Sequence, residues 1–333
     1  MEKPTLSDYA TLINTLFDEF QQTQPIELKF EKLNTFKTRE LIVLFVLFQF
    51  RRIFGFQTQR KWLDYHPELI ELLEFERIPD RTTLSRRYKK LEKIIQAFIF
   101  FIGQAVTDLD DAFTNDNLAE DKSLFKANGP VWHQSDRLNG VIPAKLRRLD
   151  TDATWSKSGY QGWVYGYGLH MTCTDAAFPK MAVVDTASLS DSIVIDQKAD
   201  LILFDIQPHT LVADNGYAKA MRIRNWLKAG TILITPAMKW VNGRYAVAYH
   251  AFLESDMAQR QFVKRKTSVE PLFDLIAQVI GASGMQKQLH VQKLKNVQTH
   301  LLLGVLSVQI SMIMNAILGY PLRQISHIRA CFT

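Results

Sequence analysis

The hydrophobic pattern of the chain changes near residue 117, and this change limits the folds that the chain can adopt. Before it, apolar residues recur at intervals of three and four, as at Leu12, Leu16 and Phe20. That interval is the period of an α-helix. Only two glycines occur in the first 110 residues. We therefore expect residues 1–110 to form an all-helical domain.

Beyond residue 117, short strand-like runs alternate with helical ones. In the clearest run, Val164, Gly166 and Gly168 alternate with Tyr165 and Tyr167. The order βββαβαβα predicts an α/β domain over 117–333, a mixed sheet flanked by helices. A small insertion near 236–250 is expected, with a hairpin over 239–249. The expected strands are 118–126, 163–174, 180–186, 210–213 and 231–235, and the expected helices are 190–203, 217–228 and a long helical tail.

Composition places the chain among soluble proteins of a reducing compartment. Its 333 residues are 47% hydrophobic and 22% charged, and its only cysteines are Cys173 and Cys331. Two distant cysteines exclude a disulfide framework and a thiolate zinc cluster, which favours the cytoplasm. The apolar run 301–318 is long enough to cross a bilayer. Polar residues such as Gln309 and Asn315 interrupt it, so we interpret it as a buried helix and expect no membrane partner.

Basic residues are clustered, although the formal net charge is only +6. Residues 77–93 contain seven basic and two acidic residues, a local charge of +5, and 126–148 carry +4. Asp80 is placed to cap a helix within the first cluster. The preceding helix, 57–73, would then be the first half of a helix-turn-helix, which indicates DNA contact. The alternative is a solvated basic helix face.

Three acidic residues stand where a site built on a sheet needs them. Asp121 lies on the first strand, Asp214 ends a short strand and Glu270 begins a helix. Polar groups at strand ends converge on a shared crevice in open α/β sheets. Carboxylates gathered there are stable as anions when a cation sits between them, and oxygen ligands favour two Mg²⁺ (or Mn²⁺) ions. That arrangement suits in-line displacement at phosphorus. Taken singly, an acid in such a position is more often a helix cap or a surface charge than a metal ligand.

The amino-acid sequences around these acids also show a family resemblance. The segments Asp121–Ala127, Leu149–Trp155, Gly162–His170 and Val212–Tyr217 together resemble the DDE transposases of bacterial insertion sequences. The resemblance extends from about Asp121 to the C-terminus. It implies an RNase H-like catalytic domain that performs metal-dependent DNA strand cleavage and strand transfer at element ends.

The resemblance also implies the roles of individual residues. Asp121, Asp214 and Glu270 would be the catalytic acids and the ligands of two metal ions. The partner would be double-stranded DNA, both terminal inverted repeats and target, bound by a homodimer in the bacterial cytoplasm near the nucleoid. The expected DNA-binding residues are basic and come from three segments: Arg81, Arg86, Arg87, Lys89, Lys126, Arg147, Arg148, Lys264, Arg265 and Lys266.

Several positions depart from the family pattern. Glu120 stands where an apolar strand residue is expected, Lys122 where a small residue is expected, and Asn215 where a lysine is usual. A charged strand interior is costly unless it is paired. These departures leave two alternatives open: a catalytically decayed transposase that only binds DNA, and a hydrolytic nuclease of the same fold. Asp191, before a helical run, could assist metal binding but is interpreted as a cap or turn residue. Glu254 and Asp256 are competitors of Glu270.

Overall fold

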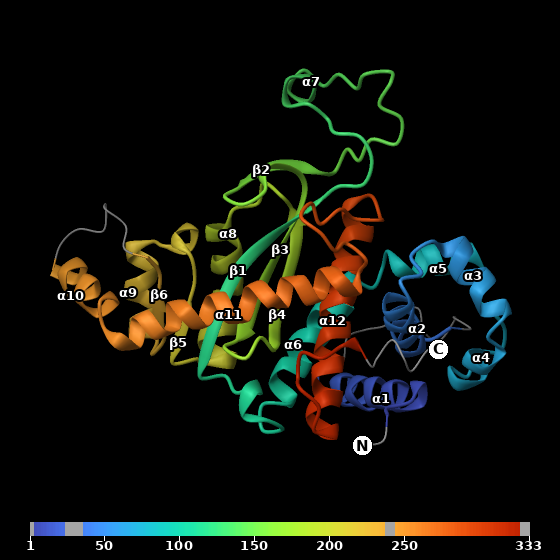
Figure 1. Ribbon diagram of the computed structural model, residues 1–333, viewed down its shortest axis with the longest axis horizontal. Coiled ribbons are helices and arrows are strands. Elements are labelled where there is room, and N and C mark those ends of the chain that lie inside the picture. Colours follow the sequence, from blue (N-terminus) through green and yellow to red (C-terminus); the bar gives the residue numbers. More distant parts are fainter. Residues whose placement is uncertain (1–2, 24–35, 237–243, 327–333) are drawn as a thin grey trace.

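The computed structural model describes residues 3–23, 36–236 and 244–326 (Figure 1). The molecule is an α/β protein in which a mixed sheet is flanked by helices. All regular elements described before residue 106 are helices, as the sequence predicted for this region. They are α1 (Leu6–Thr23), α2 (Thr38–Arg51), α3 (Phe56–Asp64), α4 (Pro67–Leu72), α5 (Arg81–Tyr88) and α6 (Glu92–Ala105).

The basic segment forms a capped helix, but the helix before it is broken. The Asp80 carboxylate accepts a hydrogen bond of 2.8 Å from the Thr83 amide, so the predicted cap of α5 is confirmed. The single helix expected over 57–73 is wrong, because α3 ends at Asp64 and α4 begins at Pro67. Proline is tolerated at the first position of a helix but not in its interior, where its ring clashes with the preceding turn.

The sheet has six strands, in the order β2-β3-β1-β5-β6, with β4 pairing β3 beside β2. Strands β1, β3 and β4 are antiparallel neighbours, whereas β5 and β6 run parallel to β1. All five expected strands are present, and β2 is an additional one. The strands are β1 (Asn117–Lys126), β2 (Thr154–Ser158), β3 (Gly162–Thr174), β4 (Pro179–Thr186), β5 (Thr210–Val212) and β6 (Ile232–Ile234).

Helices connect the parallel strands and close the chain. The hairpin expected over 239–249 is wrong from residue 244 onward, where the chain is helical, and residues 237–243 lie outside the described ranges. In Figure 1, α11 runs across the sheet. The helices are α7 (Gln134–Leu138), α8 (Asp191–Asp200), the π-helical turn η3 (Leu201–Ile206), α9 (Ala220–Lys228), α10 (Arg244–Leu253), α11 (Asp256–Val279) and α12 (Leu294–Leu318); short 3₁₀ turns are η2 (Asp111–Phe113) and η4 (Asn215–Tyr217).

Helix α12 is the central helix of the core. Among the described residues it is the single helix long and apolar enough to cross a membrane by itself; α2 and α3 pass the same test only as a pair bent by 98°. The most apolar window of α12 is 83% buried, against α1, α2, α6, α11 and β4, which is consistent with a soluble protein. Some of its polar side chains have partners in the core: the Gln309 side-chain amide donates to the carbonyls of Ile99 and Pro179. The predicted buried helix is confirmed.

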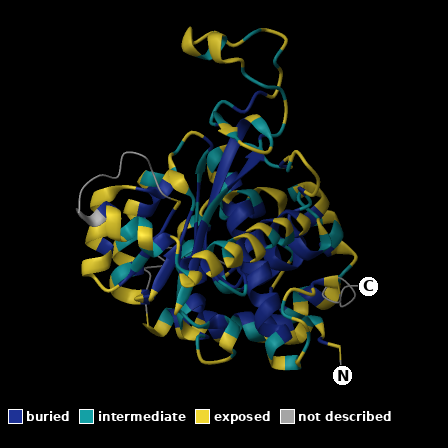
Figure 2. Cartoon of the chain, turned by 60° about the vertical axis from the view of Figure 1, so that its left-hand side comes forward, coloured by how far each residue is buried: buried dark blue, intermediate teal, exposed yellow. Residues whose placement is uncertain are grey.

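The long segment between β1 and β2 stands apart from this core. Figure 2 shows α7 and its flanking loop projecting from the body of the molecule, with mostly exposed or half-buried residues, while the sheet and α12 are buried. A hydrogen bond joins the two ends of this segment: the Trp155 indole of β2 donates to the Trp132 carbonyl, just before α7, at 2.8 Å. Loops of this length in compact domains are usually either functional or linker segments.

A buried lysine links the helical region to the sheet. Lys180 of β4 is fully buried, and its Nζ donates to the carbonyls of Gly103 at the end of α6 and Phe113 in η2. Burial lowers the pKa of Lys180 to about 7. A neutral amine has two N–H groups, and Lys180 Nζ donates hydrogen bonds to two carbonyls here.

This pKa predicts a pH-dependent stability. Between about pH 7 and 10, the unfolded chain binds a proton at Lys180 that the folded chain does not, so the free energy of unfolding rises with pH. The slope from this group is at most about 1.4 kcal/mol per pH unit. Substituting Lys180→Met removes that slope. Urea denaturation of both proteins between pH 7.5 and 9.5 measures this difference. The free energy of unfolding should rise with pH more steeply for the wild type than for the variant. Equal pH dependence in the two proteins would contradict a buried neutral amine at Lys180.

Candidate active site

The three acids predicted from the sequence line one cleft of about 760 Å³. Asp121 comes from β1, Asp214 follows β5, and Glu270 lies on α11, which packs on β1. The turn between β2 and β3 and the last turns of α11 complete the walls. Residues separated by 93 and 56 positions in the chain therefore face a common space.

The register of the sheet explains why Asp121 and Asp214 meet. Strands β1 and β5 are parallel neighbours, with Ala119 opposite Val212. Each aspartate lies two residues further along its strand, which places both at the same level and, because strand side chains alternate, toward the same face. The convergence is a consequence of parallel pairing at the carboxyl end of β5.

The Asp121 carboxyl group has a raised pKa. Burial, the main cause, and the negative charge of Asp214 together raise this pKa to about 6, against the opposing effect of Arg265. Arg265 of α11 donates from Nη1 to Asp121 Oδ2, and the two side chains are 16% and 18% exposed. Arg265, expected on a DNA phosphate, thus faces the first acid of the site.

Asp214 is held by the turn that follows it. Its carboxylate accepts a hydrogen bond of 2.7 Å from the Gly216 amide and caps the short turn η4. A Cβ added at Gly216 would lie 2.8 Å from Asp191 Oδ2 and 3.0 Å from Asp214 Oδ1. A side chain at this position would therefore have to displace the Asp191 or Asp214 carboxylate.

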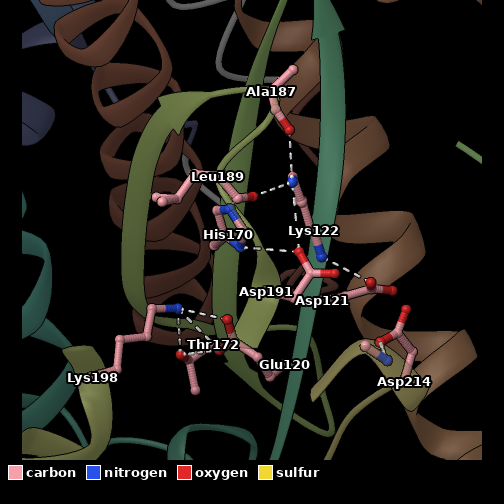
Figure 3. A network of polar contacts seen from close by, with 11 residues as sticks. Glu120, Asp121, Lys122, His170, Thr172, Ala187, Leu189, Asp191, Lys198 and Asp214 are labelled. Atoms are coloured by element: carbon pink, nitrogen blue, oxygen red, sulfur yellow. Dashed lines mark hydrogen bonds and ion pairs between the residues drawn. The ribbon is translucent and has the colours of Figure 1, made fainter. Parts of the chain in front are cut away.

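Asp191 is a site residue for which the sequence interpretation preferred a cap or turn role over metal binding. It was expected to cap α8, but it forms no cap hydrogen bond, and Ser190 occupies the cap position. Asp191 instead lines the cleft, with Oδ1 3.6 Å from Lys122 Nζ and 3.7 Å from His170 Nδ1 (Figure 3). Burial raises the pKa of Asp191, and the charge of Asp214 adds to the effect.

Lys122, which departs from the family pattern, anchors the turn leading into α8. Its Nζ donates to the carbonyls of Ala187 at 2.9 Å and Leu189 at 2.6 Å (Figure 3). Burial lowers the pKa of Lys122, whereas the nearby carboxylate of Asp191 raises it. The lysine thus fixes the position of Asp191 beside the other acids.

His170 lies behind this group on β3. It is fully buried, and its pKa is lowered to about 2 by burial and by the charges of Lys198 and Lys122, so the imidazole is neutral. Neither ring nitrogen has a hydrogen-bond partner among the described residues. His170 therefore contributes no charge to the cleft.

Glu120, the other unusual residue of β1, is paired in the interior. Lys198 of α8 donates to both Glu120 carboxylate oxygens at 2.8 and 3.0 Å, and the Thr172 hydroxyl donates to the same carboxylate (Figure 3). Glu120 and Lys198 are 0% and 1% exposed. Sequence reasoning did not identify Lys198 because the partner lies 78 residues away on another element.

The donors of the cleft fit a hard divalent cation by type. Asp121, Asp191 and Asp214 offer carboxylate oxygens, which Mg²⁺ and Mn²⁺ prefer. Glu270 lines the same cleft from an exposed position on α11. Within the described ranges, no three His, Cys, Asp or Glu side chains lie close enough together to hold one metal ion. The cleft gathers suitable ligands without bringing them to coordination distance.

The predicted DNA-binding residues are distributed over the surface. Arg81, Arg86 and Lys89 line a hollow beside α5, whereas Arg87 donates to the Phe36 carbonyl and the Thr38 hydroxyl. Arg87 is thus engaged in holding the start of α2.

The basic residues of the other two segments differ in their contacts. Lys126 Nζ donates to Gln286 at 2.9 Å, and Lys264 forms an ion pair with Asp175. Arg147, Arg148 and Lys266 are exposed. The second and third segments therefore leave only part of their positive charge available to a ligand.

No protein-family model, curated protein or solved structure matches this chain. A function for the protein therefore depends on the chemistry of the cleft and of the surfaces around it.

Proposed function

We propose that the protein is a DNA transposase of the DDE type, which cleaves DNA strands at the ends of an insertion sequence and transfers them to target DNA. The observation that carries the proposal is the convergence of Asp121, Asp214 and Glu270 on one cleft. Their order and spacing match what the motif resemblance implies for the catalytic acids.

The topology supports an RNase H-like catalytic domain. The sheet order β4-β3-β1-β5-β6, with three antiparallel strands followed by two parallel ones, is the order expected for that fold. Helices α8 and α9 connect the parallel strands, and α11 brings the third acid to the sheet. Asp121 within β1 and Asp214 after the end of the neighbouring β5 face the crevice where such sheets bind ligands.

In this proposal Asp121, Asp214 and Glu270 hold two Mg²⁺ (or Mn²⁺) ions, and Asp191 lies beside them. When bound, the ions supply Lewis-acid activation of the attacking oxygen and stabilise the leaving one. The chain's own residues prepare the site: Gly216 orients Asp214, and Lys122 holds the turn that carries Asp191. Arg265 forms an ion pair with Asp121, which lines the cleft.

The partner in this proposal is double-stranded DNA. Arg81, Arg86 and Lys89 beside α5, with the exposed basic residues near the cleft, would contact backbone phosphates. Joining two element ends requires two active sites, so we propose a homodimer on DNA, in the bacterial cytoplasm at the nucleoid.

A second candidate is a decayed transposase that binds DNA without cleaving it. The observation favouring it is that the carboxylates in the described part of the chain do not gather into a three-ligand metal site. The two candidates share DNA binding and differ only in chemistry.

Incubating the wild-type protein with supercoiled plasmid and Mg²⁺ separates these functions. A transposase nicks or cuts the plasmid and joins a labelled 3′-hydroxyl end to it, and EDTA stops both steps. Cutting without joining would indicate a hydrolytic nuclease of the same fold. Binding in a gel-shift assay with neither product in Mg²⁺ or Mn²⁺ would support the decayed copy and contradict the enzyme.

A further inference from the structure

A second hollow, of about 590 Å³, lies between α5 and the beginning of α12. Five of its lining side chains are cationic and none is a carboxylate; the lining residues are Phe56, Arg81, Thr82, Ser85, Arg86, Lys89, Lys90 and Lys295. We name it the basic pocket. Four of its cations come from a basic segment already evident in the sequence. The fifth, Lys295, comes from the first turn of α12, about 200 residues away.

Four of the five cations of the basic pocket have no anion beside them in the part of the chain that the structure describes. Arg81, Arg86, Lys89 and Lys295 are exposed, and their side chains form no hydrogen bond or ion pair with any described residue. Elsewhere, buried or half-buried cations such as Lys198 and Arg265 are paired with carboxylates. Like charges around one hollow repel each other, so an anion that enters it lowers the energy of all of them.

The two walls of the basic pocket are joined by buried hydrogen bonds. The Thr299 hydroxyl of α12 donates to the Tyr88 carbonyl at the end of α5 at 3.0 Å. The Tyr88 hydroxyl lies 3.3 Å from His300 Nδ1, and both residues are buried. Lys295 is one turn before Thr299 on the same helix. Its position relative to α5 is therefore fixed by the core and not by surface side chains.

The basic pocket connects to the acidic cleft through one segment of chain. Ser283 and Lys287 line the cleft and also the adjoining hollow of about 520 Å³, which extends to His290. Lys295 follows His290 by five residues, a span of at most about 18 Å for an extended chain. A ligand held at the basic pocket therefore lies within a few nucleotides of this hollow, since duplex DNA rises about 3.4 Å per residue of each strand.

We propose that the basic pocket binds a backbone phosphate of duplex DNA, with Lys295 of α12 acting together with Arg81, Arg86 and Lys89. The duplex then passes along residues 283–290 toward the carboxylate cleft. Lys295 is thus a DNA contact supplied by the catalytic half of the chain. The inference rests on the proposed function for the identity of the ligand, and it adds the path by which that ligand reaches the site.

The test measures DNA binding by fluorescence anisotropy in EDTA, with the full-length protein and a labelled 30-base-pair duplex. We expect Lys295→Gln to weaken binding several-fold at 0.1 M salt. It should also reduce the slope of log K against log salt by about 0.9, the value for one phosphate contact. The matched control is Lys228→Gln, an exposed lysine that ends α9 on the far side of the molecule (Figure 1), which should bind as wild type does.

The outcomes separate this inference from the proposed function. If Lys295→Gln binds DNA as wild type does, or Lys228→Gln weakens it equally, the phosphate contact is wrong, even if the protein cleaves DNA. If only Lys295→Gln weakens binding and the wild type never cleaves, the inference stands without the enzyme. Vesicles containing phosphatidylserine test the other phosphate source: binding that depends on Lys295, with DNA binding unchanged, would overturn the proposal. Equal melting temperatures of the three proteins exclude a folding effect.

Discussion

Asp121→Asn and Asp214→Asn should each lower Mg²⁺-dependent cleavage of DNA by about 1,000-fold or more. A metal ion stabilises the transition state of phosphoryl transfer by several kcal/mol, and each 1.36 kcal/mol corresponds to a factor of ten. Both side chains line the cleft from adjacent strands, Asp121 within β1 and Asp214 after the end of β5, so each substitution removes an anionic oxygen from the proposed site. Single-turnover cleavage of a labelled duplex, with protein in excess, measures the loss.

The same variants should bind DNA at least as tightly as the wild type. Removing a negative charge from a cleft that receives a polyanion reduces repulsion, so anisotropy in EDTA should show unchanged or stronger binding. Loss of cleavage with loss of binding would instead indicate a structural role. If cleavage persists in Asp121→Asn, Asp214→Asn and Glu270→Gln alike, the assignment of the site is wrong.

Glu270 has a matched control within the chain. Glu254 is also exposed and near the same helix, but it does not line the cleft. Glu270→Gln should therefore lower cleavage strongly while Glu254→Gln leaves it unchanged. The opposite result would assign the role of the third acid to Glu254, which follows α10 and lies outside the cleft.

The parts of the site that could be predicted from sequence are those fixed by strand periodicity. Asp214 directly follows an apolar strand, Asp121 lies on a strand that begins with apolar residues, and parallel pairing of β1 with β5 brings the two together. The other four expected strands were predictable from short apolar or alternating runs, and helix α12 from its long apolar run. The N-terminal cap at Asp80 follows from local hydrogen bonding alone.

The parts that could not be predicted depend on contacts between distant segments. Strand β2 has half-buried residues and no apolar pattern, and it exists because β3 extends beyond β4 and leaves an edge to pair. Asp191 resembled a cap because local sequence does not reveal that Lys122 holds its turn against β1. Likewise, nothing near Arg265 indicates that its partner is Asp121, 144 residues earlier.

The buried pair of Glu120 and Lys198 leads to the second prediction with a large effect. Lys198→Met should lower the free energy of unfolding by about 3 to 5 kcal/mol, because it leaves the Glu120 carboxylate unpaired in the interior. The double variant Glu120→Gln with Lys198→Met should recover most of this loss. Glutamine keeps an acceptor for the Thr172 hydroxyl, and replacing both charges of a buried pair is often neutral. Urea denaturation of the wild type, Glu120→Gln, Lys198→Met and the double variant gives the coupling energy between the two side chains.

The double variant also separates the role of this pair from that of the neighbouring Asp121. Glu120 points into the interior and Asp121 into the cleft, since strand side chains alternate. If the pair only secures α8 against the sheet, the double variant should cleave DNA as the wild type does once its stability is restored. An intact fold with cleavage reduced as strongly as in Asp121→Asn would mean that the charge on Glu120 or Lys198 acts on the cleft itself. Equal stability of Lys198→Met and the double variant would show instead that the carboxylate takes up a proton when its lysine is removed.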